Sequence, residues 1–181
     1  MNMFKYRGFT LVELVVVLAI LSLLSAASIA AFVSYNRAQG VSVGGQEVRT
    51  ILYTARSYAL AQANTPQECY SGQCQCPSGQ TFVGYRVVFC CASGGGQNCP
   101  NTCIVNDSAE HYELNLLCSS SSFTVETDHF PTGVSVSNAS TSRSFSFEAV
   151  TGAVTGAGML RIGNAFSQTN DITVSALGVI Q

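Results

Sequence analysis

The chain has 181 residues, of which 47% are hydrophobic and only 10% are charged. Ordinary soluble proteins carry about 25% charged residues, so the surface should be unusually neutral, and the length allows one modest domain beside a helix. The formal net charge of −2 disfavours nucleic-acid binding driven by bulk positive charge.

The first predicted element is an apolar helix, because Leu14 to Val33 contains no charged side chain. At about 1.5 Å rise per residue, about 20 such residues cross the ~30 Å hydrocarbon core of a bilayer. A secretory signal peptide is one alternative, since Lys5 and Arg7 form a basic n-region and Ala26-Ala27-Ser28 could serve as a cleavage site. The run exceeds the usual h-region of about 7 to 15 residues, which favours a membrane span. A single-span anchor is the second alternative.

An acidic residue opens this run, in the segment Arg7-Gly8-Phe9-Thr10-Leu11-Val12-Glu13. A carboxylate near the end of a membrane segment costs a few kcal/mol unless it meets a partner. A cut after Gly8 would free the amine of Phe9, four residues before Glu13 and on the same helical face. This amine could neutralise Glu13 of its own chain or of a neighbouring subunit, which would link proteolysis to assembly.

These residues resemble the class III signal of type IV pilins and type II secretion pseudopilins. The resemblance implies cleavage between Gly8 and Phe9 by a prepilin peptidase, N-methylation of Phe9 by the same enzyme, and Glu13 as the assembly residue. It also implies a leader at 1–8 and an inner-membrane protein, spanning at about 9–33 with its head outside the cytoplasm, that later enters a filament. The implied partners are other pilin or pseudopilin subunits, the prepilin peptidase/N-methyltransferase, the inner-membrane assembly platform and, before assembly, membrane lipid. No cofactor is expected, and loss of the leader leaves 8 − 2 = 6 basic and 10 acidic side chains, a charge of −4.

A second helical stretch is expected to extend the helix over 9–64. Its apolar residues recur every three or four positions at Val48, Ile51, Leu52, Ala55, Tyr58 and Ala59. Asn64, Thr65 and Pro66 should end the helix, because proline disfavours a helical residue before it. Three glycines in 39–45 predict a kink or a locally melted turn, with a plain loop as the alternative.

A β-rich head is expected at 65–181, because the periodicity changes to alternation after the helix. The expected strands are Thr81–Phe89, Tyr112–Leu117, Ser122–Glu126, Gly133–Val136, Ser144–Val150, Met159–Ile162 and Asp171–Val174. They follow one another without helices between them, so the sheets should be mostly antiparallel. The predicted fold class is α+β, a long N-terminal hydrophobic helix packed on an antiparallel β-rich head.

The helix and head resemble, in the order of several short segments, the GspH/FimT group of minor pseudopilins and pilins. These segments are Ala55-Arg56-Ser57-Tyr58-Ala59, Phe130-Pro131-Thr132-Gly133, Phe145–Phe147, Gly152, Gly156–Ile162, Ile172-Thr173-Val174 and Gly178. The resemblance implies two antiparallel sheets packed against the helix and a place at or near a filament tip. The chain departs from the group after Gly178, where no basic residue follows, and in its cysteine-rich insertion.

That insertion, at 69–118, holds all eight cysteines: Cys69, Cys74, Cys76, Cys90, Cys91, Cys99, Cys103 and Cys118. In an exported domain this number favours four disulfides, with about 105 possible pairings. Adjacent Cys90 and Cys91 in a strand would face opposite sides and take different partners. A metal site is the alternative, but neither Cys74-Gln75-Cys76 nor the pair Cys99 and Cys103 has standard zinc or iron-sulfur spacing, so no metal is expected.

Catalysis finds little support in the sequence. His111 and His129 are isolated from any cysteine or carboxylate pattern, and Gly40-Val41-Ser42-Val43-Gly44 matches a nucleophile elbow only by letter, because it joins two helical stretches. No calcium loop with full ligand spacing is present either. The sequence therefore predicts a structural subunit and no enzyme.

Two functions are consistent with these features. The first is a minor pilin or pseudopilin that primes or caps a filament. The second is a pilus-tip binding module whose insertion contacts surfaces, cargo or DNA. DNA contact is disfavoured, because Arg86 is the only Lys or Arg between Cys69 and Cys118.

Overall fold

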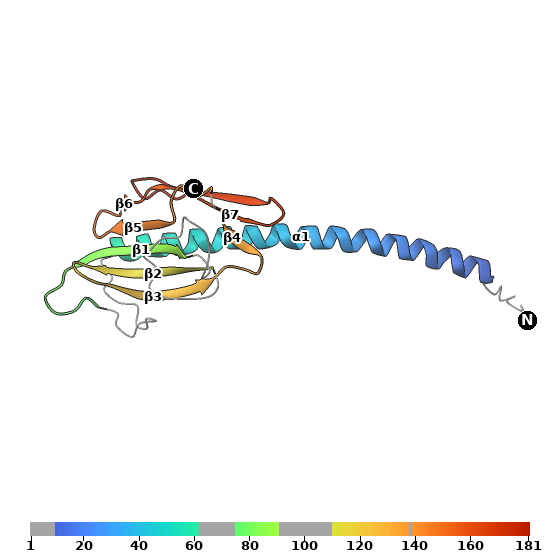
Figure 1. The fold of residues 1–181 in the computed structure, drawn as a ribbon, viewed down its shortest axis with the longest axis horizontal. Coiled ribbons are helices and arrows are strands. Elements are labelled where there is room, and N and C mark those ends of the chain that lie inside the picture. Colours follow the sequence, from blue (N-terminus) through green and yellow to red (C-terminus); the bar gives the residue numbers. More distant parts are fainter. Residues whose placement is uncertain (1–9, 62–74, 91–109, 138) are drawn as a thin grey trace, which may run out of the picture. The chain divides into compact units, whose positions relative to one another are not determined.

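The computed structural model describes residues 10–61, 75–90, 110–137 and 139–181 (Figure 1). The chain divides into two compact units, Met1–Ala38 and Gln39–Gln181. The helix α1 covers Leu11–Leu60, so its first part belongs to the first unit and its last part to the second. All strands belong to the second unit.

A local hydrogen bond lies at the start of α1, and a bond from a distant segment of the head lies at its end. At its start, the Thr10 hydroxyl accepts a hydrogen bond from the Glu13 backbone N–H at 3.2 Å, which satisfies one of the free donors of the first turn. At its end, the carbonyl of Ala59 accepts a hydrogen bond from the N–H of Val150 at 3.3 Å. The helix therefore ends at Leu60, before the predicted stop at Asn64 to Pro66, which lies outside the described residues.

The expected melted turn and the alternative of a plain loop are wrong, because α1 is helical without interruption through Gly40, Gly44 and Gly45. The glycines serve close packing. A Cβ on Gly44 would lie 3.2 Å from Val134 Cγ1, and one on Gly45 would lie 3.0 Å from Asn170 Cγ. Side-chain-free positions thus let the head approach the helix backbone, and the resulting contacts offset the poor helix propensity of glycine. Ser42 lies inside this helix, so no strand-to-helix elbow forms around it.

Eight strands form in the described part of the head. They are β1 (Phe82–Cys90), β2 (His111–Cys118), β3 (Ser122–His129), β4 (Val134–Val136), β5 (Ser144–Glu148), β6 (Val154–Thr155), β7 (Gly158–Asn164) and β8 (Thr169–Val174). All seven expected strands are present, with boundaries that differ by up to three residues. The sequence missed β6, because two residues are too few to show alternation.

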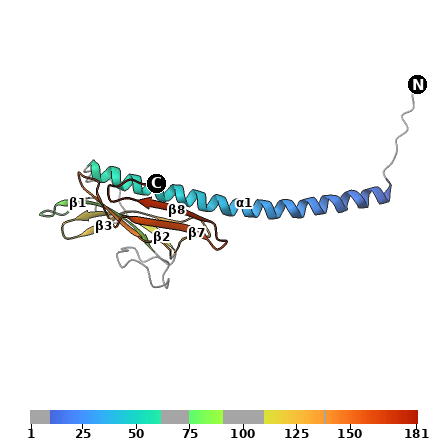
Figure 2. The same ribbon diagram turned by 90° about the horizontal axis from the view of Figure 1, so that it is seen from above.

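The strands form two antiparallel sheets. One has the order β3-β2-β1-β5-β6 and the other the order β4-β7-β8. Because each sheet is built from antiparallel pairs that follow a single helix, the α+β class is confirmed. Figure 2 shows β7 and β8 alongside the part of α1 that belongs to the second unit.

One hydrophobic core joins α1 and both sheets in the second unit. The predicted apolar helix face is confirmed, since Val48, Leu52, Ala55 and Ala59 are fully buried there. The largest buried side chains of the sheets are Tyr85, Phe89, Leu114, Leu116, Phe145, Phe147, Leu160, Ile162 and Ile172. Burial of each large apolar side chain contributes about 1.5 to 3 kcal/mol, so this core holds the head to its own helix segment.

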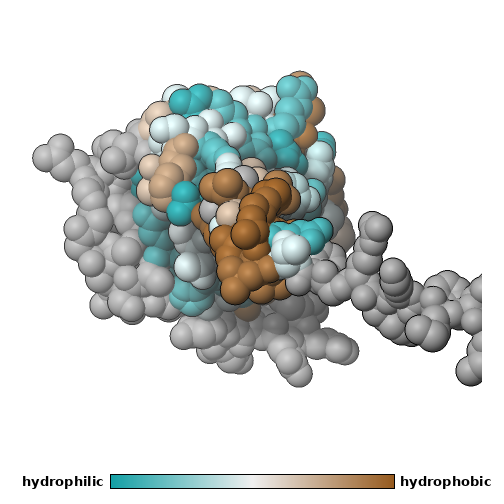
Figure 3. Space-filling model, turned by 90° about the vertical axis from the view of Figure 1, so that its right-hand side faces the viewer, coloured by the Kyte–Doolittle hydropathy of each residue, from teal (hydrophilic) through white to brown (hydrophobic). Residues whose placement is uncertain are grey.

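The first unit presents apolar side chains to its surroundings. Its described large aliphatic residues are more than a third exposed, and Leu11 and Leu23 are 78% and 73% exposed. Hydrophobic residues also gather in the central brown area of Figure 3. No helix formed by the described residues combines the length and the apolar character that crossing a membrane requires.

Candidate functional site

Glu13 lies in the first turn of α1, with its side chain exposed. The partial positive charge at a helix N-terminus stabilises an acidic side chain in this turn by about 0.3 to 1 kcal/mol. Gly8 and Phe9, between which cleavage is expected, lie outside the described residues.

The structure gives Glu13 a local role that the sequence reasoning missed. Thr10-Leu11-Val12-Glu13 has the Thr-x-x-Glu pattern of a capping box, and the bond from the Glu13 N–H to the Thr10 hydroxyl is half of that motif. The pattern was visible in the sequence. Glu13 therefore lies at a helix start that is fixed in part by its own segment.

Residues 3–29 match the family model described as the prokaryotic N-terminal methylation motif. The chain carries a type IV pilin-like prepilin signal. Proteins with this signal are structural subunits that interact with other pilins and are processed by prepilin peptidase, which agrees with a membrane-anchored precursor and an extracytoplasmic filament. No curated protein and no solved structure matches the chain.

Three of the segments that resemble the GspH/FimT group meet in the head. Gly178 has φ +77°, and a Cβ there would lie 2.6 Å from the carbonyl oxygen of Gly152 and 3.0 Å from Arg56 Nε. Gly152 itself has φ +63° and approaches the last turn of α1 at Leu60. Glycine adopts these positive φ angles without strain, and its lack of a side chain lets the three segments pack closely here.

The head also brings together polar residues that the sequence treated as isolated. His111 and Glu113 are 1% and 0% exposed, with His111 Nε2 at 3.5 Å from Glu113 Oε1. Asn115 donates a hydrogen bond to Glu113 Oε2 at 3.0 Å, and the rings of His111 and His129 are 5.9 Å apart. The interpretation of His111 as isolated is therefore wrong, because residues two apart in a strand share a face. The alternation His-x-Glu-x-Asn in β2 is the signal that could have revealed it.

Ligand atoms of Cys90, His111 and Glu113 lie within 4.8 Å of one another, a spacing compatible with a metal ion. However, Cys90 is disulfide-bonded, so its sulfur is no thiolate ligand. His111 and Glu113 alone are too few for a structural metal site. This cluster is best described as a buried polar row on the sheet.

A disulfide joins Cys76 to Cys118 and links the segment before β1 to the end of β2. Both residues belong to the hydrophobic core or pack against it. The sulfur of Cys76 is thus not available for the metal alternative at Cys74-Gln75-Cys76. The other expected disulfide cysteines, Cys69, Cys74, Cys91, Cys99 and Cys103, lie outside the described residues.

Proposed function

We propose that this chain is a minor pilin or pseudopilin, similar to the GspH/FimT group, that joins a type IV pilus or a type II secretion pseudopilus through its N-terminal helix and primes or caps the filament. The observation that carries the proposal is the methylation motif at 3–29. In the same chain, the head packs on the second part of the helix through one hydrophobic core. The sheet pair and the packing site at Arg56, Gly152 and Gly178 support the GspH/FimT assignment.

Processing prepares the helix start for assembly. Prepilin peptidase cleaves between Gly8 and Phe9 and methylates the new amine, which then carries a positive charge. The Glu13 carboxylate of a neighbouring subunit lies in the first turn of its helix and pairs with this amine. An unpaired carboxylate in an apolar bundle is costly, so the pairing selects correctly processed subunits.

Before assembly the helix lies in the inner membrane. The uncharged run from Leu14 to Val33 supports this placement, and Lys5 and Arg7 favour a cytoplasmic leader by the positive-inside rule. The disulfides of the head fit an oxidising compartment outside the cytoplasm. During assembly the exposed apolar side chains of the first unit exchange lipid for sister helices.

Two substitutions at Glu13 test the pairing. Glu13→Gln keeps a hydrogen-bonding side chain for the capping box but removes the charge, whereas Glu13→Ala removes both. We expect both variants to be cleaved and both to be absent from sheared filaments, measured by immunoblot of cell and filament fractions. Incorporation of Glu13→Gln at the normal level would show that only the cap matters and would contradict the charge pairing.

The processing step has its own control. Mass spectrometry of the mature wild-type chain should find an N-methylated Phe9 as first residue, and Gly8→Leu should accumulate the uncut precursor. An intact Met1 terminus in filament-associated wild-type protein would contradict the proposed maturation.

A further inference from the structure

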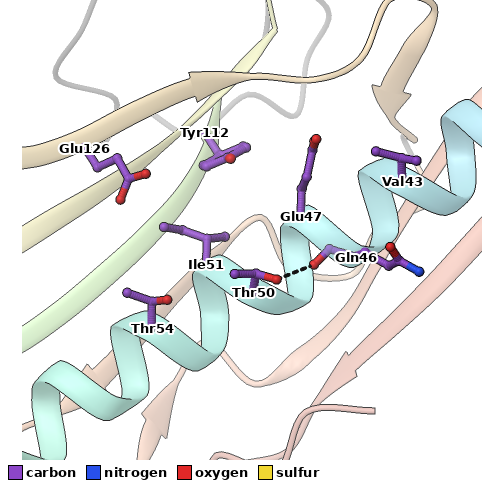
Figure 4. Close-up of a pocket in the computed structure, with 8 residues that line it drawn as sticks. All are labelled: Val43, Gln46, Glu47, Thr50, Ile51, Thr54, Tyr112 and Glu126. Atoms are coloured by element: carbon purple, nitrogen blue, oxygen red, sulfur yellow. Dashed lines mark hydrogen bonds between the residues drawn. The ribbon is translucent and has the colours of Figure 1, made fainter.

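A groove of about 350 Å³ runs between α1 and the edge of the five-stranded sheet, within the second unit. Figure 4 shows Glu47 and Glu126 extending into it from opposite walls. The helix wall adds short or apolar side chains, and β2 contributes Tyr112. The lining residues are Val43, Gln46, Glu47, Thr50, Ile51, Thr54, Tyr112 and Glu126.

Two carboxylates line the groove, those of Glu47 and Glu126, and the carboxylate of Asp128 lies beside it, close to Glu47 and Tyr112. Tyr112 donates a hydrogen bond to Asp128 Oδ2 at 3.5 Å, and the pKa of Tyr112 is raised by burial and by the carboxylates of Asp128, Glu47 and Glu126. Burial and Asp128 also raise the pKa of Glu47. In the described part of the chain, no lysine or arginine forms an ion pair with any of these three carboxylates.

Among the described residues, none forms a hydrogen bond with Glu47 Oε2 in the groove. This oxygen is buried, although the rest of the side chain is partly exposed. Burial of a carboxylate oxygen without a hydrogen-bond donor is unfavourable, so a donor from another molecule would stabilise it.

We infer that this groove binds an arginine or lysine side chain presented by a neighbouring filament subunit. This inference rests on the proposed function and deepens it. The aliphatic stem of such a side chain packs over Val43 and Ile51, and its charged head reaches Glu47 on one wall and Glu126 on the other. Three carboxylates without a described counter-charge favour a cationic partner over a neutral or acidic one, since complementary charge fixes register between subunits.

The test uses the full chain, produced in cells together with the other subunits of its machine. A photo-crosslinking amino acid replaces Thr54, a groove residue, and in a control chain it replaces Thr169, which is exposed on β8 of the other sheet. We expect a discrete adduct with a filament subunit from position 54 alone. Its cross-linked peptide should contain an arginine or lysine.

Charge removal then distinguishes recognition from mere proximity. The Glu47→Gln/Glu126→Gln pair should lower the adduct yield about tenfold or more, as expected for loss of a close charge pair. Glu148→Gln, the same change on an exposed strand residue away from the groove, should leave the yield unchanged. Glu47→Lys should abolish the adduct, and reversal of the partner's basic residue to glutamate should restore it.

Three results would overturn the inference. The first is an adduct whose yield does not change in the double variant. The second is an adduct that is lost on chelation and restored by calcium, which would identify a metal ion as the occupant. The third is the absence of any adduct from a chain that enters filaments normally. The proposed function is judged separately. Absence of the processed wild-type chain from sheared filaments would refute it, whatever the groove binds.

Discussion

At the scale of single residues, Glu47 carries a carboxylate in a place that the fold makes unfavourable. Burial raises its pKa above the usual 4.5, and the charge of Asp128 raises it further. A carboxyl group whose folded-state pKa lies above its unfolded-state pKa destabilises the fold once it ionises. The penalty is absent well below pH 4.5 and grows as the pH rises through the raised folded-state value.

Glu47→Gln should therefore raise the melting temperature of the full chain in detergent near neutral pH, and this gain should vanish under acidic conditions well below pH 4.5. Circular dichroism melts of both chains across this range measure the effect, with Glu148→Gln as the control that shows no gain. Equal melting temperatures of wild type and Glu47→Gln at neutral pH would mean that the charge of Glu47 does not destabilise the fold. A stability gain together with lost partner binding would mark Glu47 as a residue kept for function.

At the scale of elements, the glycines of α1 decide how the head meets its helix. Glycine inside a helix normally costs about 1 kcal/mol relative to alanine. Gly40 and Gly45 lie on the same helix but differ in surroundings. A Cβ on Gly40 would make an ordinary contact, 3.6 Å from Val134 Cγ2, whereas one on Gly45 would displace Asn170. Displacement would also break the hydrogen bond that Arg49 donates to Asn170 Oδ1 at 3.4 Å.

Gly40→Ala and Gly45→Ala should consequently differ in their effect on the free energy of unfolding. Gly40→Ala should stabilise the chain by about 0.5 to 1 kcal/mol, and Gly45→Ala should lack this gain or lose stability. In an Asn170→Ala background Gly45→Ala should recover the gain, which a double-mutant cycle of unfolding free energies measures. If Gly45→Ala stabilised the original chain as much as Gly40→Ala, the close approach would not be the reason for the glycine.

At the scale of the whole molecule, a disulfide joins two segments of the head that are far apart in the sequence. The Cys76–Cys118 disulfide closes a loop of 42 residues between the segment before β1 and the end of β2. Cross-linking stabilises a fold mainly by restricting the unfolded chain, and a loop of this length gives about 4 kcal/mol when no other bridge shortens it.

The paired substitution Cys76→Ser/Cys118→Ser should lower the free energy of unfolding by about 2 to 4 kcal/mol, since the disulfide at Cys90, which lies inside this loop, also restricts the unfolded chain. Denaturant unfolding of the oxidised full chain measures the loss, and wild type under reducing conditions should lose more. An unchanged midpoint would show that the remaining bridges restrict this loop completely.

Sequence patterns predicted the helix and most of the strands, because helical and extended periodicity depends on residues close together in the chain. The apolar face at Val48, Leu52, Ala55 and Ala59 and the alternation in the strands follow from helical and extended periodicity. Strand ends and β6 were missed or misplaced, because hydrogen bonding to neighbouring strands sets them and no local pattern encodes it. The methylation motif was readable for the same reason as the helix: it lies in one short continuous segment.

The sequence by itself determined the prepilin-like start, the single helix and the antiparallel head, since each depends on residues close together along the chain. Only the tertiary structure decided that α1 continues through its glycines, that His111 lies against Glu113, and that Glu47 lies near Asp128 and lines one groove with Glu126. Those outcomes depend on strand register and on the packing of the head against the helix, which bring distant residues together and change the cost of a glycine, a charge or a buried polar group.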